Sequence, residues 1–417
     1  MAGDDLRHGR RHGEARLPLD HVHDPMTILR GLPILLLFGF WPTTAFAIVL
    51  WFGGAESGGV HIRNVIQTVE GFSVSAGTPT AETTHVRSGA YAYQFDAGDA
   101  VNVALTLSTD YYVRLFLYAT SNPSAQFNLV TCQTSGAVGV TLHVTTDGKL
   151  AWSYNNGAVV NTGADSIALS TWNLIQYRCA RNASTGGAEV KLNGVTQFSA
   201  FSTNTSGVVS DRVAFACGAT CGITIWVDDV QIRNDAYPAD GRIIARQGRS
   251  GTPTDDAWTK NSCTGSVIVG CWSDTPFSAS SNVSTATANA LQTMLVASFS
   301  STQGGHGSEV INSADTINAA AIGFIWKRST TNSLGPINPR RIVGGSATDG
   351  AQSYQGATTD VWGSEGAVWT ATLANLNAME AGVRITGTPS ATSTVEDLWV
   401  FVDFTPSPIP VSVRVTQ

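Results

Sequence analysis

The sequence has little charge of either sign. Charged residues make up 13% of the 417 residues, with 24 Lys and Arg against 31 Asp and Glu, and the formal net charge is −7. The basic residues are mostly single arginines, and outside the N-terminal segment they form no basic stripe. Nucleic-acid binding requires concentrated positive charge, so we expect no nucleic-acid partner.

Helical periodicity is also scarce, and alternation takes its place. Apolar side chains recur at every second position, as in Val101, Val103 and Leu105, and turn signals such as Asp147-Gly148 separate the runs. A period of two with closely spaced turns is typical of antiparallel sandwiches. The sequence therefore predicts an all-β protein with two antiparallel β-sandwich domains in tandem and one short helix in the second.

The first 47 residues do not fit this pattern. Residues 1–25 are polar, and we expect them to be disordered. In residues 26–47 a basic residue, Arg30, precedes a short apolar run that ends in Ala45-Phe46-Ala47, which is typical of a secretory signal peptide cleaved after Ala47.

Two alternatives stay open for this segment. The 21 uncharged residues from Leu32 to Phe52 are long enough for one membrane helix, although Pro42 would interrupt it. In the third alternative the protein starts near residue 47, and residues 48–52 form a first strand. We expect the protein outside the cell or in a virion, with membrane anchoring as the alternative.

The patterning also predicts where the domains end. The first domain is expected over residues 48–234, a linker over 235–241, the second domain over 242–405 and an extended tail over 406–417. In the second domain we expect a helix with Thr370 as N-cap and Gly382 as its stop. The strands expected there are residues 266–270, 291–299, 319–327 and 395–404.

Three segments of the first domain carry a family resemblance. Residues 172–194 combine a strand opened by Trp172, a polar Gly turn, a second strand and Asn193-Gly194. Together with residues 148–154 and 226–232, this order resembles the concanavalin A-like or laminin-G-like jelly roll. That resemblance implies a sandwich with a binding or structural role, and it implies that Trp172 packs in the core.

A second resemblance lies in the second domain. Residues 368–383, which run from Val-Trp-Thr to Glu-Ala-Gly-Val, resemble a segment of bacteriophage and prophage virion proteins. The resemblance implies virion proteins as partners and a homo-oligomer. The alternative function is that of a secreted bacterial carbohydrate-binding protein.

Acidic pairs suited to catalysis are missing from the first domain. Glycoside hydrolases with this sandwich place carboxylates as Glu-x-Asp-x-Glu or Glu-x-Asp-x-x-Glu, and neither spacing occurs. Glu70, Glu82 and Glu189 have no acidic partner at strand spacing. We therefore expect a non-enzymatic protein, with a glycoside hydrolase as a further alternative.

One acidic pair, Asp228-Asp229, is a candidate metal site. Adjacent strand residues face opposite sides of a sheet, so these two carboxylates are not expected to act together. The jelly-roll resemblance implies that they could bind a structural calcium ion at the rim; otherwise one caps a turn and the other is solvated. No other cofactor is expected.

The six cysteines allow disulfides. Cys217 and Cys221 have no second Cys pair or His cluster nearby to complete a zinc site, so a disulfide or buried thiols are expected. Cys263 and Cys271 flank a short apolar stretch and are candidates for a loop-closing disulfide.

The candidate ligand-binding residues lie around one turn. Trp152 and Tyr154 lead into Asn155-Asn156, and aromatic faces beside amides are what sugar recognition uses. A glycan or cell-surface ligand is therefore predicted there, with a purely structural hairpin as the alternative. His306, within a Gly-rich stretch, is expected to be a loop residue without a catalytic role.

Overall fold

The computed structural model describes the parts of the chain that build the sheets. These parts are residues 49–53, 55, 72–134, 137–155, 157–248, 257–261, 269–272, 282–287, 289–301, 309–330, 335–350, 361–364, 369 and 371–408. They lie within one compact unit, residues 45–417. The predicted signal peptide, residues 26–47, lies outside them, and residues 49–52 of the alternative membrane helix belong to strand β1 (Val49–Gly53). No helix of the described residues is long and apolar enough to span a membrane.

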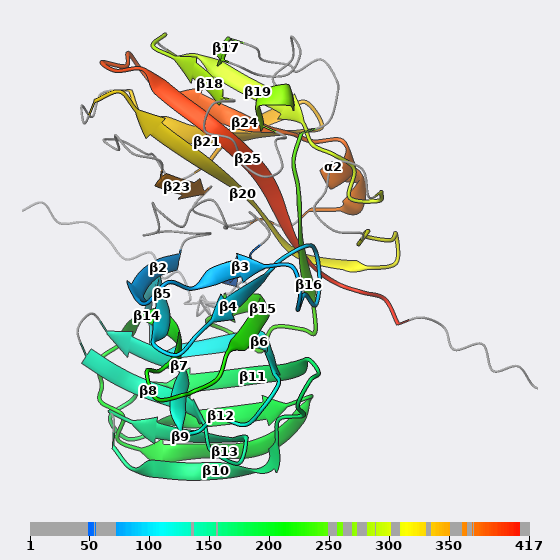
Figure 1. Cartoon of the computed structure of the whole chain (residues 1–417). Coiled ribbons are helices and arrows are strands. Elements are labelled where there is room, and N and C mark those ends of the chain that lie inside the picture. The colour runs from blue at the N-terminus through cyan, green and yellow to red at the C-terminus, as the bar shows by residue number, and fades with distance from the viewer. Residues whose placement is uncertain are drawn as a thin grey trace, which may run out of the picture. The chain divides into compact units, whose positions relative to one another are not determined.

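The fold is all-β, as the sequence predicts, and its first sandwich consists of two antiparallel sheets (Figure 1). Sheet A has the strand order β13-β12-β11-β6-β15-β4-β3, with β1 also paired to β15. Its strands are β1 (Val49–Gly53), β3 (Thr80–Glu82), β4 (Ala92–Phe95), β6 (Asp110–Ala119), β11 (Asn173–Ala180), β12 (Gly186–Leu192), β13 (Val195–Thr203) and β15 (Ile225–Arg233).

Sheet B packs against sheet A and has the order β10-β9-β8-β7-β14-β5-β2. Its strands are β2 (Phe72–Ala76), β5 (Asp99–Ser108), β7 (Phe127–Thr134), β8 (Ala137–Val144), β9 (Lys149–Tyr154), β10 (Val159–Ser166) and β14 (Ser210–Cys217). The predicted hairpin around Asp147-Gly148 is present, because β8 pairs with β9.

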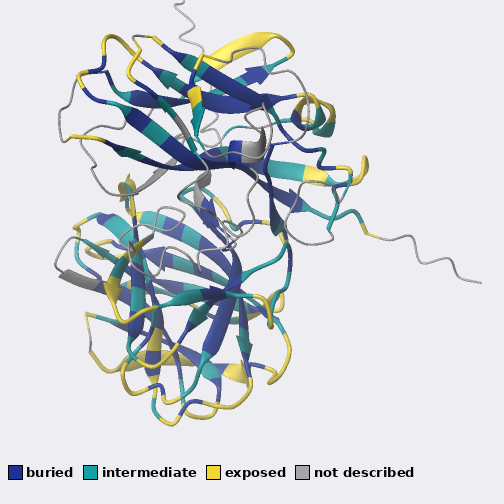
Figure 2. Ribbon diagram, turned by 45° about the horizontal axis from the view of Figure 1, so that its top comes forward, coloured by how far each residue is buried: buried dark blue, intermediate teal, exposed yellow. Residues whose placement is uncertain are grey.

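The alternation of inward and outward side chains along the strands shows where the core of this sandwich lies. On β11, Ile175, Tyr177 and Cys179 are buried between the sheets, whereas the residues between them face outward and are half-buried. The turn after β12 has Asn193 and Gly194 at φ of 51° and 81°, as a type I′ hairpin turn requires. Figure 2 shows the same contrast, with buried strands and exposed turns.

The second sandwich has a six-stranded sheet C and a four-stranded sheet D in the described residues. Sheet C contains β16 (Arg242–Arg246), β17 (Thr259–Asn261), β18 (Asn282–Thr285), β20 (Thr316–Arg328), β23 (Val361–Ser364) and β25 (Ser393–Thr405). Sheet D contains β19 (Leu291–Leu295), β21 (Ile337–Val343), β22 (Ser346–Asp349) and β24 (Glu380–Ile385).

Two short helices belong to this sandwich; the predicted helix is present as the second of them, and the first was not predicted. Helix α1 (Val269–Trp272) occupies part of the predicted strand 266–270. Helix α2 (Leu373–Asn377) has Thr372 as its N-cap, because the Thr372 hydroxyl accepts from the Asn375 N–H at 3.2 Å. The predicted N-cap, Thr370, lies outside the described residues.

Gly382 is not a helix stop but a strand residue of β24. It pairs with Thr293 of β19, and a Cβ at this position would clash with the backbone oxygen of Gln292. The glycine therefore serves the close approach of two strands. The position of Gly382 after the helical pattern did not identify a helix end, because glycine also occurs where two strands approach closely.

Along β25, both faces of sheet C are buried. One face packs on sheet D, and the other forms a cluster with Phe52 of β1. This explains why β25 is buried at almost every position and does not alternate. The cluster against Phe52 consists of Ile243, Ala245, Ala319, Ile325, Trp399 and Phe401.

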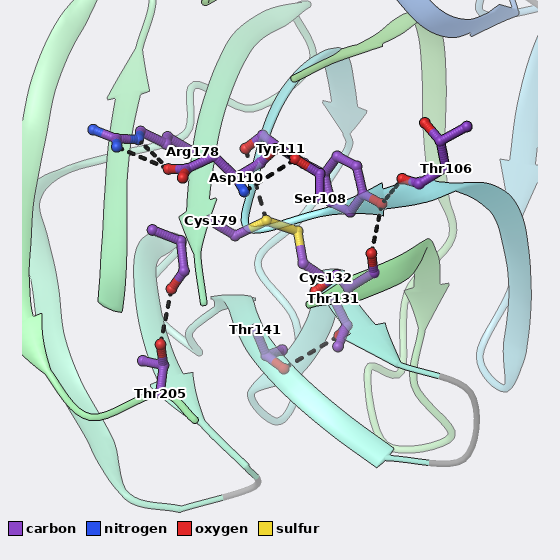
Figure 3. Close-up of a disulfide and its surroundings, with 12 residues drawn as sticks. Thr106, Ser108, Asp110, Tyr111, Thr131, Cys132, Thr141, Arg178, Cys179 and Thr205 are labelled. Atoms are coloured by element: carbon purple, nitrogen blue, oxygen red, sulfur yellow. Dashed lines mark hydrogen bonds and ion pairs between the residues drawn. A yellow bond between two sulfur atoms is a disulfide. The ribbon is translucent and has the colours of Figure 1, made fainter. Parts of the chain in front are cut away.

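Two disulfide bonds stabilise the first sandwich, and Figure 3 shows the one between Cys132 and Cys179. Cys132 on β7 is bonded to Cys179 on β11, so this bridge joins sheet B to sheet A. Beside it, the Tyr111 hydroxyl donates to the backbone oxygens of Thr106 at 2.6 Å and Ser210 at 2.8 Å. A second bridge, Cys217–Cys221, settles the two predicted alternatives for that pair in favour of a disulfide.

Candidate functional site

The outer face of sheet A has two differently covered parts. Four side chains of β6 point outward in a row: Tyr112, Arg114, Phe116 and Tyr118. Arg114 is 0% exposed and Phe116 is 5% exposed, whereas Tyr118 is only half-buried. We call the surroundings of Arg114 and Phe116 the covered part, and those of Tyr118 the open part.

The linker and the second sandwich make the covered part. The Arg114 guanidinium donates to the backbone oxygens of Asp229 at 3.0 Å and Ala239 at 2.8 Å, and it pairs with Asp403 at 3.1 Å. Asp403 lies on β25 of the second sandwich and is fully buried. An outward-facing arginine of the first sandwich is thus neutralised by the second.

Asp228 and Asp229 meet at the same place, contrary to the predicted opposite faces. The Asp228 carboxylate accepts from the Ser88 N–H at 3.2 Å, and the Asp229 carboxylate accepts from the Ser88 hydroxyl. The reason is an irregularity in β15: the register with β6 shifts between Asp228 and Gln231, and Asp229 has φ of 51°. Both carboxylates are fully buried, so neither is solvated.

Burial raises the pKa values of two carboxyl groups in the covered part. The pKa of Asp228 lies well above its usual value, because burial and the neighbouring Asp229 charge outweigh three backbone N–H donors. Burial also raises the pKa of Asp403, although the positive charge of Arg114 opposes this shift. The covered part therefore favours a retained proton on Asp228.

Asp228 and Asp229 do not fit the predicted calcium site. Their oxygens accept hydrogen bonds from Arg87, Ser88 and the backbone N–H of Ile243, and the Arg87 guanidinium lies against Asp229. A cation would have to displace this guanidinium and several N–H donors. The described part of the chain contains no cluster of three or more His, Cys, Asp or Glu suited to a metal.

Four aromatic side chains form the open part, and we call them the aromatic site: His85, Tyr118, Trp172 and Trp226. Trp226 on β15 lies directly opposite Tyr118 on β6. The ring centroid of Tyr118 is 5.7 Å from that of Trp226 and 5.5 Å from that of Trp172. His85 stacks on both Trp226 at 4.0 Å and Tyr118 at 4.7 Å.

An open hollow of about 540 Å³ borders the aromatic site. Trp226 lines it, and this side chain is only 9% exposed. Its indole N–H is buried and has no hydrogen-bond partner among the described residues. A buried donor without an acceptor costs free energy, and the indole N–H groups of Trp152 and Trp258, among others, are in the same position. The other residues of the hollow are Ala97, Thr120, Ser121, Gly222, Ile223 and Thr224.

Two carboxylates flank the aromatic site. Asp96 accepts from the Thr224 hydroxyl at 2.6 Å, and Glu82 lies 3.3 Å from the His85 ring. Burial raises the pKa of Glu82, but hydrogen bonds from Thr84 and His85 outweigh it and leave the pKa below its usual value. The aromatic site and its hollow contain no lysine or arginine.

The predicted ligand-binding residues lie elsewhere. Trp152 on β9 is 0% exposed in the core of the first sandwich, so its ring cannot face a ligand. Tyr154 packs partly against the same core, and Asn155 is an exposed turn residue with φ of 55°. Asn156 lies outside the described residues.

Two other predictions fall partly or wholly outside the described ranges. Cys271 is disulfide-bonded, but Cys263 is not described, so their pairing stays a prediction. His306 is not described either.

Sequence reasoning missed the aromatic site because it assigned Trp172 to the core. Trp172 lies just before β11 and is half-buried on the outer face. A usable signal was present: Phe116 and Tyr118 alternate with the inward Leu115 and Leu117, so their rings must face outward.

Comparisons with known proteins add little beyond the fold. No family model and no curated protein match the chain. The similar solved structures include the cellulose-induced protein Cip1, at 14% identity and a TM-score of 0.32, covering 42% of this chain and 91% of that one. They also include domain 4 of the extracellular arabinanase AbnA from Geobacillus stearothermophilus, in complex with arabinotriose, at 12% identity and a TM-score of 0.33, covering 46% of this chain and 95% of that one.

The sialidase of Trypanosoma rangeli is a third similar structure. It is 13% identical with a TM-score of 0.29, and the match covers 40% of this chain and 28% of the sialidase. These three proteins are carbohydrate-related by their names, but at such low similarity they carry no argument about activity. The fold itself is an antiparallel jelly-roll-like sandwich joined to a second sandwich.

Proposed function

We propose that the protein is a non-enzymatic adhesion protein whose aromatic site binds a glycan. The observation that carries the proposal is the group of four aromatic side chains on the outer face of sheet A, with an open hollow beside Trp226. Aromatic rings pack on the C–H faces of sugars.

The chemistry of the site favours an uncharged glycan. Thr120, Ser121 and Thr224 bring hydroxyl groups to the hollow, and these suit the hydroxyls of a sugar. Glu82 and Asp96 add negative charge, and no lysine or arginine of the site offsets it. Carboxylated or sulfated glycans would be repelled.

The carboxylates support a role without catalysis. A general acid for glycoside hydrolysis needs a raised pKa, whereas hydrogen bonds hold the pKa of Glu82 below its usual value. Asp96 is engaged by Thr224, and the sequence has neither of the acidic spacings typical of hydrolases on this sandwich.

For its setting we propose a virion or the outside of the cell. The bridges Cys132–Cys179 and Cys217–Cys221 suit an oxidising environment. The resemblance of residues 368–383 to virion proteins supports the virion, and with it a homo-oligomer. Labelling of purified virus particles with an antibody to the protein tests this setting. If no particle carries the protein, the alternative of a secreted carbohydrate-binding protein is favoured.

A glycan array probed with the purified full-length chain tests the binding function. Tyr118→Ala and Trp172→Ala should each weaken binding roughly tenfold, because each removes one stacking ring. Trp226→Ala removes a third ring and should also weaken binding roughly tenfold.

The matched control is Tyr154→Ala, which removes a half-buried ring of sheet B in the first sandwich. We expect it to leave glycan binding unchanged. If the wild type binds no glycan, or if binding survives all three substitutions at the aromatic site, the proposed function is wrong.

A further inference from the structure

The loop of residues 83–90 connects the aromatic site to the covered part of sheet A. It joins β3 to β4, and its His85 contributes one ring of the aromatic site. Two and three residues further on, Arg87 and Ser88 reach the buried carboxylates of β15. The position of one wall of the site therefore depends on contacts made outside it.

The first set of contacts comes from β15. Asp228 accepts from the backbone N–H groups of Arg87 at 2.9 Å and Ser88 at 3.2 Å. The Asp229 carboxylate accepts from the Arg87 guanidinium and the Ser88 hydroxyl. The Arg87 guanidinium also lies over the ring of Phe116, at 3.2 Å from its centroid.

The second set comes from the linker and the second sandwich. Arg87 donates to the Gly241 backbone oxygen and to Asp240, both at 2.8 Å. Ser88 donates to the backbone oxygen of Ile243 on β16 at 3.1 Å. The Gly89 N–H donates to the Glu309 carboxylate at 3.2 Å.

Glu309 is the contact that is easiest to isolate. One of its oxygens accepts from Gly89 and the other pairs with Arg242 at the start of β16. Glu309 is half-buried, and none of its bonds described above involves a ring of the aromatic site. A change at Glu309 therefore alters how the loop is held without altering the rings.

We propose that the second sandwich positions His85 through Glu309 and the linker, and thereby sets the ligand affinity of the aromatic site. The inference rests on the proposed glycan binding. A loop that is already ordered has less conformational entropy to lose on binding, so fixing residues 83–90 strengthens the complex. Glu309 is a positioning residue in this scheme.

The test uses the full-length chain with Glu309→Ala and the conservative Glu309→Gln. We measure hydrogen exchange of the amides of residues 84–89, the NMR shift of the His85 ring protons over Trp226, and the affinity for the glycan found on the array. Glu309→Ala should raise the exchange rate of these amides roughly tenfold and weaken glycan binding roughly tenfold. It should also change the chemical shift of the His85 ring protons. Glu309→Gln keeps an acceptor for the Gly89 N–H, so its exchange rate, His85 chemical shift and glycan affinity should be close to those of the wild type.

Asp349→Ala is the matched control, because it removes a carboxylate paired with Arg340 and Arg384 inside sheet D. It should leave all three measurements unchanged. Unaltered loop exchange and His85 shift in Glu309→Ala would overturn the inference, and so would altered exchange with unaltered affinity. A wild type that binds no glycan would overturn the proposed function alone, and exchange and His85 shift would then decide whether the second sandwich positions His85.

Discussion

Phe116 and Tyr118 are two residues apart on β6 and face the same side of sheet A, yet they have different surroundings. Phe116 is 5% exposed beneath Arg87, whereas Tyr118 is half-buried among the rings of the aromatic site. In the covered part every charged group discussed above has a partner, whereas in the open part His85, Tyr118 and Trp172 are only half-buried. The covered part stabilises the fold, and we propose that the open part binds the ligand.

The largest expected effect comes from breaking the buried pair of the covered part. Arg114→Met should lower the free energy of unfolding by about 3–5 kcal/mol, because it leaves Asp403 buried without its cation. Urea denaturation of the full-length chain measures this. The double variant Arg114→Met/Asp403→Leu should recover most of the loss, since no unpaired charge remains.

Arg178→Met is the matched control on the same sheet. It breaks the Arg178–Asp110 pair, whose side chains are roughly a third exposed, and should cost less than about 1 kcal/mol. Equal losses in the two arginine variants would contradict the distinction between a covered and an open outer face.

The second effect comes from the inner side of sheet A. Cys132→Ala/Cys179→Ala should lower the free energy of unfolding by roughly 2–4 kcal/mol, because this bridge joins residues 47 apart and restricts the unfolded chain. Cys217→Ala/Cys221→Ala should cost less, since that bridge spans only 4 residues. Thermal unfolding followed by circular dichroism measures both, and a larger loss from the short bridge would refute this ranking.

The two rings of β6 give the third test. Phe116→Ala should cost about 3 kcal/mol as a large-to-small change at a buried position, whereas Tyr118→Ala should cost about 1 kcal/mol. Glycan affinity should respond to Tyr118→Ala. Similar losses of stability in the two variants would mean that the outer face is covered evenly.

The smallest expected effect is a dependence of the free energy of unfolding on pH, which arises in the covered part. The pKa of Asp228 is raised from an ordinary 3.8, so the folded state keeps a proton that the unfolded state has lost. Stability should then fall as pH rises above 3.8 towards the raised pKa. Asp403, whose pKa is also raised, adds a contribution of the same sign.

Asp228→Asn should remove the part of this slope that Asp228 causes. Urea denaturation of wild type and variant between about pH 4 and about pH 7 measures the difference. The same pH slope in wild type and Asp228→Asn would show that Asp228 is ionised in the folded state.

Much of the fold was predictable because strands leave a local signal. The inward positions of β11 and the hairpin of β8 and β9 follow from alternation. Helix α2 lies where the sequence predicts a helix, but its predicted end at Gly382 was wrong because Gly382 belongs to a strand pair that only the partner strand β19 reveals. Trp152 was taken for a binding residue because alternation shows which residues share a face but not which face is buried.

The sequence by itself determined the class of fold, since period-two patterning and Asn-Gly or Asp-Gly turns act within a few residues. Only the tertiary structure decided which outward side chains stay accessible. Arg114 is buried by residues more than a hundred positions away and Phe116 lies beneath Arg87 of another loop, whereas Tyr118 is only half-buried. The aromatic site likewise depends on long-range contacts, because His85, Tyr118 and Trp226 come from separate strands and loops that meet only when sheet A forms.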